Sequence, residues 1–175
     1  MRFQILLFFS FLLSLQVSAQ NRIIQLQGVD LETEIPENWE ILEEDASIEV
    51  SSPNSDIMIS FQSFPEAELE AVLAGLDQMM AETILDLKPV SEPSMIDING
   101  LPVMMSDASG LMDCLPVQIA IFLVPSDDMV LLILGIARSN AKEEDIKGLE
   151  TVIGQLKKSS FYFQPYFRGN DVLLQ

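Results

Sequence analysis

The chain contains no histidine and only one cysteine, Cys114, among its 175 residues. Without histidine it cannot form a Ser-His-Asp triad, a Cys-His dyad or a histidine-ligated zinc, iron or copper site, because no other side chain has an unperturbed pKa near neutrality. A single cysteine excludes an intrachain disulfide and a four-thiolate cluster. We expect Cys114 to be buried, because its neighbours Met112, Leu115 and Val117 are apolar.

Basic residues are also scarce, with 9 Lys and Arg against 27 Asp and Glu and a formal charge of -18. The only adjacent basic pair is Lys157-Lys158. Nucleic acids and anionic lipids are therefore not expected as partners, since binding either depends on clustered Lys and Arg. An acidic surface attracts cations or a basic partner instead. Because 49% of the residues are hydrophobic, the chain is expected to fold rather than stay disordered.

Residues 1–19 have the pattern of a signal peptide. Arg2 supplies a positive charge, Ile5 to Leu15 is almost entirely apolar, and Val17-Ser18-Ala19 is typical of a signal-peptidase site. The apolar stretch is shorter than the about 20 residues of a membrane span. Cleavage after Ala19 would leave 8 bases against 27 acids, a formal charge of -19. The sequence predicts export to the periplasm or the extracellular space, with no stable membrane span afterwards. An uncleaved anchor is the alternative.

The first half of the remaining chain predicts strands and then a helix. Apolar and polar residues alternate through 23–63, which is typical of half-exposed strands, and turn residues separate the segments. Ser63 and Glu66 have the spacing of a helix cap. Apolar residues then recur at spacings of three and four up to Leu87, which predicts an amphipathic helix of about 20 residues. Lys88-Pro89 should end it.

The second half predicts hairpins and a closing helix. Asn99-Gly100 is a strong turn signal, and the strand that follows should end at Gly110. Leu115–Val124 and Met129–Ala137 are apolar on both faces, and the two acids at Asp127-Asp128 between them favour a hairpin over a membrane span. Strands without a polar face must be covered on both sides, so the sheet should lie between helical layers.

The closing helix is expected to open at Ser139-Asn140 and to carry Lys157-Lys158 in its last turn, the charge order that the helix dipole favours. The predicted fold class is α/β (α+β): an α/β/α sandwich in which two amphipathic helices cover an antiparallel sheet. We expect one such domain over residues 20–163, followed by a C-terminal tail at 164–175.

The order of these landmarks resembles the PsbP/Mog-type fold, which also occurs in bacterial exported proteins of the DcrB and LpqN kind. The residues that carry the resemblance are Ile35-Pro36-Glu37-Asn38-Trp39, Ser52-Pro53, Ile98-Asn99-Gly100-Leu101-Pro102, and the segment Ile146 to Ser160 leading into Phe161. The resemblance implies accessory or binding roles and supplies no catalytic residues. The metal-associated histidines of the photosynthetic members have no counterpart here.

Two groups of residues are candidate metal ligands. Three acidic clusters could bind Ca²⁺ or Mn²⁺ but lack a recognisable ligand rhythm: Glu43-Glu44-Asp45, Asp127-Asp128 and Glu143-Glu144-Asp145. Thioethers and a thiol would suit Cu(I), and the candidate ligands are Met104, Met105, Met112 and Cys114. Adjacent strand residues point to opposite faces, however, so packing is the expected role of these methionines. We predict no metal site and no cofactor.

Catalysis would need a pair of carboxylates, as in glycoside hydrolysis, and nothing in the sequence singles out such a pair. We therefore predict that the protein is not an enzyme and has no catalytic residues. An apolar ligand groove between the long helix and the sheet would be lined by residues such as Met95 or Met104.

The aromatic C-terminal segment is the candidate protein interface. The candidate residues are of types enriched at interaction hot spots: Tyr162, Tyr166, Phe167 and Arg168. Alternatively, Phe161, Phe163 and Phe167 cover the end of the sheet. The predicted function is that of an exported, non-catalytic accessory or binding protein of the cell envelope. The alternative is a divalent-cation-binding protein that uses its acidic loops.

Overall fold

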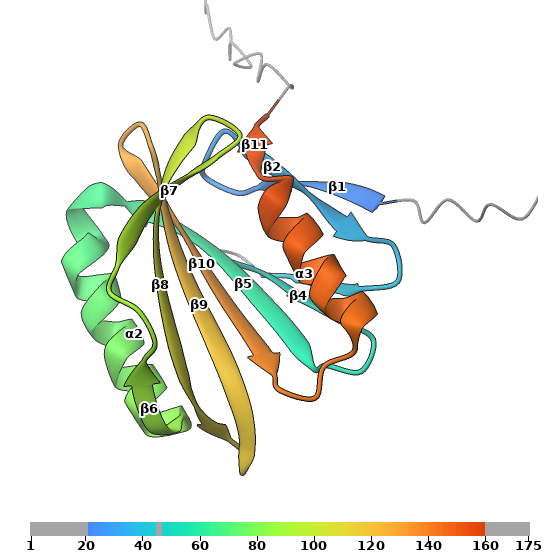
Figure 1. The fold of residues 1–175 in the computed structure, drawn as a ribbon. Coiled ribbons are helices and arrows are strands. Elements are labelled where there is room, and N and C mark those ends of the chain that lie inside the picture. The colour runs from blue at the N-terminus through green and yellow to red at the C-terminus, as the bar shows by residue number, and fades with distance from the viewer. Residues whose placement is uncertain (1–20, 45–46, 160–175) are drawn as a thin grey trace, which may run out of the picture.

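The computed structural model describes residues 21–44 and 47–159 (Figure 1). The predicted signal peptide at 1–19 and the tail at 164–175 lie outside these ranges. The same holds for the candidate interface of Tyr162, Tyr166, Phe167 and Arg168. These three predictions, and the proposed domain boundaries, stay predictions.

Within the described residues, eight strands form the larger of two sheets, and every pairing in it is antiparallel. Seven run in the order β3-β4-β5-β10-β9-β8-β6, and β7 pairs with β8. Their bounds are β3 Glu40–Glu43, β4 Ser47–Ser51, β5 Ile57–Pro65, β6 Leu85–Pro89, β7 Ser94–Ile98, β8 Leu101–Met112, β9 Leu115–Ser126 and β10 Met129–Arg138. The prediction of a mostly antiparallel sheet with two helices is confirmed.

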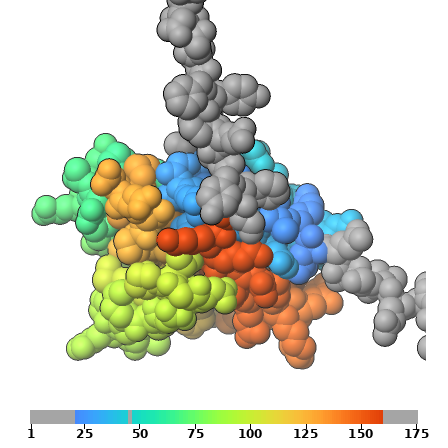
Figure 2. All heavy atoms as spheres, turned by 90° about the horizontal axis from the view of Figure 1, so that it is seen from above, coloured from blue at the N-terminus to red at the C-terminus, as the bar shows by residue number. Residues whose placement is uncertain are grey.

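A smaller antiparallel sheet, in the order β1-β2-β11, contains β1 Asn21–Leu26, β2 Leu31–Pro36 and β11 Lys157–Lys158. The placement of Lys157-Lys158 in a helix is therefore wrong, because α3 (Glu143–Gly154) ends before them. The Lys157 ammonium instead lies 3.7 Å from a carboxylate oxygen of Glu32 and 3.9 Å from one of Glu34. Pairing with β2, far away in the sequence, outcompetes extension of the helix. Figure 2 views the end of the molecule where β11 and the small sheet adjoin the β9–β10 turn.

Both faces are buried along β10 and over Phe122, Leu123 and Val124 of β9, as their sequences predict, whereas Leu115 at the start of β9 is 40% exposed. In β10, Leu131 and Ile133 belong to one apolar cluster, while Val130 and Leu132 belong to another. The first cluster also holds residues of α3 and the small sheet, and the second holds residues of α2 (Leu69–Thr83). Figure 1 shows α2 and α3 on different sides of the larger sheet.

The first helix is shorter than its apolar pattern predicts. Strand β5 runs to Pro65, and a 3-10 turn at Glu66–Glu68 leads into α2. Ser63 is not a helix cap, because its hydroxyl donates to the carbonyl of Gln27 at 2.6 Å. Leu87 and Lys88 lie in β6, where Lys88 pairs with Ser109 of β8. Leu87, whose spacing alone fits a helix, thus lies in a strand that pairs with β8.

The start of the closing helix also differs from the prediction at Ser139-Asn140. Helix α3 begins at Glu143, with Lys142 as its N-cap and without a side-chain cap hydrogen bond. Among residues 21–44 and 47–159, no helix is both long and apolar enough to span a membrane.

Strand β8 does not end at Gly110 but continues to Met112, and Asp113-Cys114 forms the turn into β9. Both turn residues have positive φ, 53° for Asp113 and 64° for Cys114. Cys114 is exposed, so the prediction that it is buried is wrong. The reason is geometric, because the turn lies at the lower tip of the sheet in Figure 1, beyond the helices. Its apolar neighbours Met112 and Val117 are buried in the strands.

The turn at Asn99-Gly100 connects β7 to β8, as predicted, with φ values of 53° and 81°. The side-chain Nδ2 of Asn99 donates to the carbonyl of Gly154 at 2.8 Å and to that of Leu156 at 2.9 Å. The Gly154 carbonyl is in the last residue of α3 and would otherwise lack a helical partner, and the Leu156 carbonyl follows just after the helix. The turn residue therefore fastens the C-terminus of α3 to the sheet.

We expect Asn99→Asp to lower the free energy of unfolding by about 1–3 kcal/mol, measured by urea denaturation. Aspartate tolerates the same backbone conformation, but its carboxylate cannot donate and would place a negative charge at a helix C-terminus. Asp97→Asn is the matched control, since an amide oxygen can still accept the hydrogen bond from the Gly100 amide. Equal stability of the two variants would contradict the capping role.

Candidate functional site

A groove of about 860 Å³ lies on the α2 side of the larger sheet, over β3, β4, β5 and β10. Helix α2 contacts the neighbouring part of this face, where Leu73 and Leu76 line a smaller pocket with residues of β8 and β9. Over the strands from β3 to β5, α2 contributes only Met79 to the lining of the groove. The groove is therefore the part of this sheet face that the helix leaves open.

The floor and one wall of the groove are apolar. Met58 of β5 and Leu134 and Ile136 of β10 line it and pack against the apolar cluster of α2. Met79 of α2 forms the wall and is 43% exposed, and Leu42 of β3 is 55% exposed on the other side. Large exposed apolar side chains on both sides of one hollow indicate a surface that binds apolar groups.

The β3–β4 side of the groove is acidic. Glu40 pairs with Ser51 and Leu42 with Glu49, so these side chains share one face of the two-stranded ladder. Glu40 and Glu49 are exposed. Among the described residues, Arg22 is the one basic residue that lines the groove, and its guanidinium donates to the carbonyl of Trp39. The groove thus combines an apolar floor with a negatively charged margin.

The polar groups of the groove include hydroxyls and carboxylates. Its hydroxyl groups come from Ser51, Ser55 and Ser60, and no histidine exists in the chain to activate them. Glu40 and Glu49 supply exposed carboxylates at its margin. The groove thus presents hydroxyl and carboxylate groups around an apolar floor.

The acidic clusters do not form a metal centre in the described part of the chain, where no three acidic or cysteine side chains could hold an ion together. Glu143 pairs with Lys147 at 2.7 Å and Glu144 with Lys142 at 3.6 Å, while Asp145 is buried. Asp127-Asp128 is the two-residue turn between β9 and β10. Asp45 lies outside the described residues, and cation binding stays an untested prediction.

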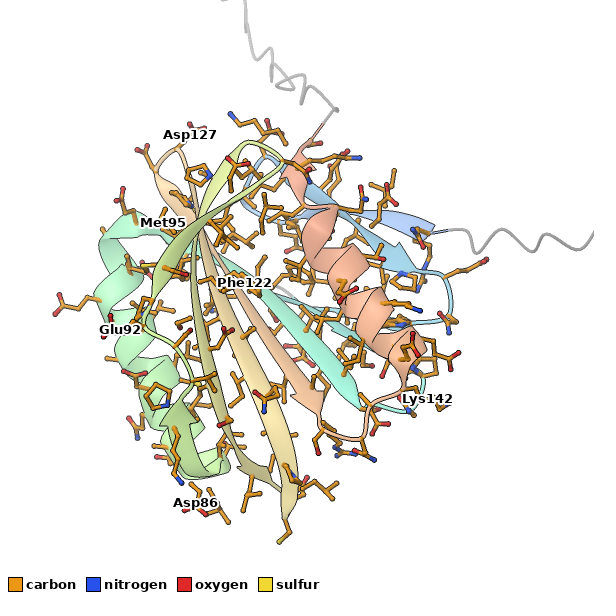
Figure 3. The ribbon with its side chains drawn as sticks, viewed as in Figure 1. Asp86, Glu92, Met95, Phe122, Asp127 and Lys142 are labelled. Carbon is orange, nitrogen blue, oxygen red and sulfur yellow. The ribbon has the colours of Figure 1, made fainter. Side chains whose placement is uncertain are left out.

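The sulfur-containing residues are dispersed. Met104 pairs with Leu123, which faces α2, and Met105 pairs with Phe122, which faces the other cluster. Met112 is buried and Cys114 is exposed. Figure 3 shows Met95 at the outer edge of the sheet and Phe122 in its interior.

The predicted pocket between the long helix and the sheet exists, has a volume of about 190 Å³ and is lined by Met104 but not by Met95. The larger groove was not predicted. A signal for it is present in the sequence, because Leu42 and Met58 occupy positions where strand alternation otherwise places polar residues.

Comparisons with known proteins identify the fold. No family model and no curated protein matches the chain. The cyanobacterial PsbP (CyanoP) of Synechocystis sp. PCC 6803 is similar with a TM-score of 0.58 and 8% identity, over 80% of this chain and 93% of that one. LpqN of Mycobacterium tuberculosis is similar with a TM-score of 0.53 and 12% identity, over 80% and 91%. A point mutant of the protein Mog1 is similar with a TM-score of 0.51 and 10% identity, over 79% and 96%.

A protein of Bacteroides thetaiotaomicron is also similar, with a TM-score of 0.51 and 12% identity over 74% of this chain, but the match spans only 45% of that protein's length. The chain therefore has the PsbP/Mog-type fold, and the resemblance found in the sequence is confirmed. At these identities the likeness extends to the fold alone.

Proposed function

We propose that the protein is an exported, non-catalytic accessory or binding protein of the cell envelope, built as an α/β/α sandwich. The groove between α2 and the β3 edge is its binding surface. The observation that carries the proposal is the groove itself: an open hollow with Leu42 and Met79 exposed on its two sides. The separate apolar clusters of α2 and α3 support the sandwich description.

Two further observations support the envelope location. The signal-peptide pattern in residues 1–19 supports export to the periplasm or the extracellular space. Among proteins of similar fold, LpqN is described as involved in cell envelope biogenesis. The lack of histidine and the exposure of the groove carboxylates support a role without catalysis.

Binding of a neutral apolar dye, N-phenyl-1-naphthylamine, to the full exported protein tests the groove. The readout is the fluorescence of the dye, which rises in an apolar site; Trp39, the only tryptophan in the chain, is 3% exposed and packs toward α3, so its own fluorescence serves only as a check on folding. We expect Leu42→Asn combined with Met79→Gln to weaken dye binding about tenfold, because two apolar contacts of under about 1 kcal/mol each are lost.

The matched control is Leu85→Asn with Val90→Asn, which changes two exposed apolar residues, 62% and 59% exposed, near β6. The order of the sheet places β6 at the opposite end from β3. An equal loss of dye binding in this control, or no loss in the groove variant, would refute the groove as the binding surface. Turnover of ester or glycoside substrates by the purified protein would refute the non-catalytic role.

A further inference from the structure

We propose that the groove receives an amphipathic helix of a partner protein, with an apolar stripe on the floor and Lys or Arg along the flank that faces β3 and β4. This inference rests on the proposed function and names the kind of partner that the groove binds.

The open sheet face is wide enough to hold one helix. Neighbouring strands lie about 4.8 Å apart, so β3, β4, β5 and β10 span about 14 Å from the first strand axis to the last. A helix with its side chains is about 10 Å across, so one helix fits over these strands. Helix α2 packs in the same way over the adjacent strands β8 and β9, through Leu73 and Leu76. A bound helix would lie beside α2 and touch Met79 on its flank.

The acidic side of the groove favours a basic partner. Glu40 and Glu49 are exposed, and among the described residues neither lies in an ion pair with Lys or Arg. Complementary charges fix the orientation of a partner and speed its association. With a formal charge of -18, a second copy of this chain would bring acids against acids. A basic helix satisfies both the apolar floor and the acidic margin.

An added strand at β3 is the rival geometry. Among the described strands, none pairs with the outer edge of β3. The strand has only four residues, two of them Glu40 and Glu43, and short charged edge strands are typical of edges that resist pairing. A strand added there would also lie outside the hollow rather than over Met58 and Leu134, which line it. The helix therefore fits the groove better.

The experiment uses three labelled peptides of about 18 residues, or five helical turns, and the full exported protein, with fluorescence anisotropy as the readout. The first has Leu at helical spacing and Lys along one flank, the second has Glu in place of every Lys, and the third is a scrambled form of the first without an apolar stripe. We expect the Lys peptide to bind at least about tenfold more tightly than either of the others.

Reversing the charge of the two groove glutamates tests whether the peptide binds in the groove. Glu40→Lys with Glu49→Lys should weaken binding of the Lys peptide about tenfold and strengthen binding of the Glu peptide. Glu92→Lys with Glu150→Lys gives the same net charge away from the groove and should change either affinity by less than about twofold. Glu92 lies in the loop between β6 and β7, and Glu150 lies on α3.

Three results would overturn the inference: equal effects of the two double variants, no binding of the Lys peptide, or equal binding of the scrambled peptide, which would favour an added strand. Dye binding separates this inference from the proposed function. If the groove binds the dye but not the Lys peptide, the helical partner is wrong and the binding groove stands. If it binds neither, both proposals fail.

Discussion

Trp39→Ala is expected to lower the free energy of unfolding by about 3–5 kcal/mol, as large truncations in a core do. Trp39 is 3% exposed and belongs to the apolar cluster that joins α3 to the sheet. Its ring lies so close to α3 that a Cβ atom added at Gly148 would be 2.6 Å from Cζ2 of Trp39. The truncation would leave a cavity between the helix and the sheet. Urea denaturation followed by circular dichroism measures the loss.

Two variants make this prediction specific. Trp39→Phe keeps most of the ring contact and should lose less stability than Trp39→Ala. Leu85→Ala truncates a side chain that is 62% exposed and should stay within about 0.5 kcal/mol of the native protein. If Trp39→Ala were as stable as Leu85→Ala, the packing of α3 on the sheet through Gly148 and Trp39 would be wrong.

Two glycines in strands of the same sheet should respond to alanine with opposite signs. A Cβ at Gly110 would lie 2.3 Å from Cγ2 of Ile84 and 2.9 Å from the backbone oxygen of Leu85. Because Ile84 is buried and the second atom is backbone, the strain is expected to cost about 1–3 kcal/mol. A Cβ at Gly135 would meet only atoms 3.8 Å or more away. Gly135→Ala should therefore gain about 0.5–1 kcal/mol, because alanine loses less backbone entropy on folding.

Thermal and urea denaturation of the two variants measure the difference. The close approach at Gly110 follows from the irregular pairing of β6 with β8, whose register shifts between Leu85 and Lys88. Should Gly110→Ala prove as stable as Gly135→Ala, β6 would not lie against β8 as described.

Local signals in the sequence predicted much of the sheet. Asn99-Gly100 forms the predicted turn because both residues tolerate positive φ, a property that depends on the residues alone. The strands around Asp127-Asp128 are apolar on both faces, and burial of both faces is the consequence of that composition. Predictions of this kind succeed because neighbouring residues decide them.

The errors share a different cause. Ile84 and Leu87 continue the helical spacing of α2, but α2 ends at Thr83, and β6 pairs with β8 instead. Lys157-Lys158 fits the end of a helix, but Glu32 and Glu34 lie across from it on β2. Gly110 looks like a strand terminator but is needed where β6 approaches β8. In each case the deciding partner lies far away in the sequence, where periodicity carries no information.

The groove also depends on contacts between residues far apart in the sequence. The sequence determined that the protein would be acidic, without histidine, and folded around strands with no polar face, because composition and alternation fix these properties residue by residue. Only the tertiary structure decided that α2 covers one part of the sheet and leaves Leu42, Met58 and Met79 around an open hollow. The physical reason is that one helix is narrower than the sheet it packs on, so its position across the strands depends on long-range packing.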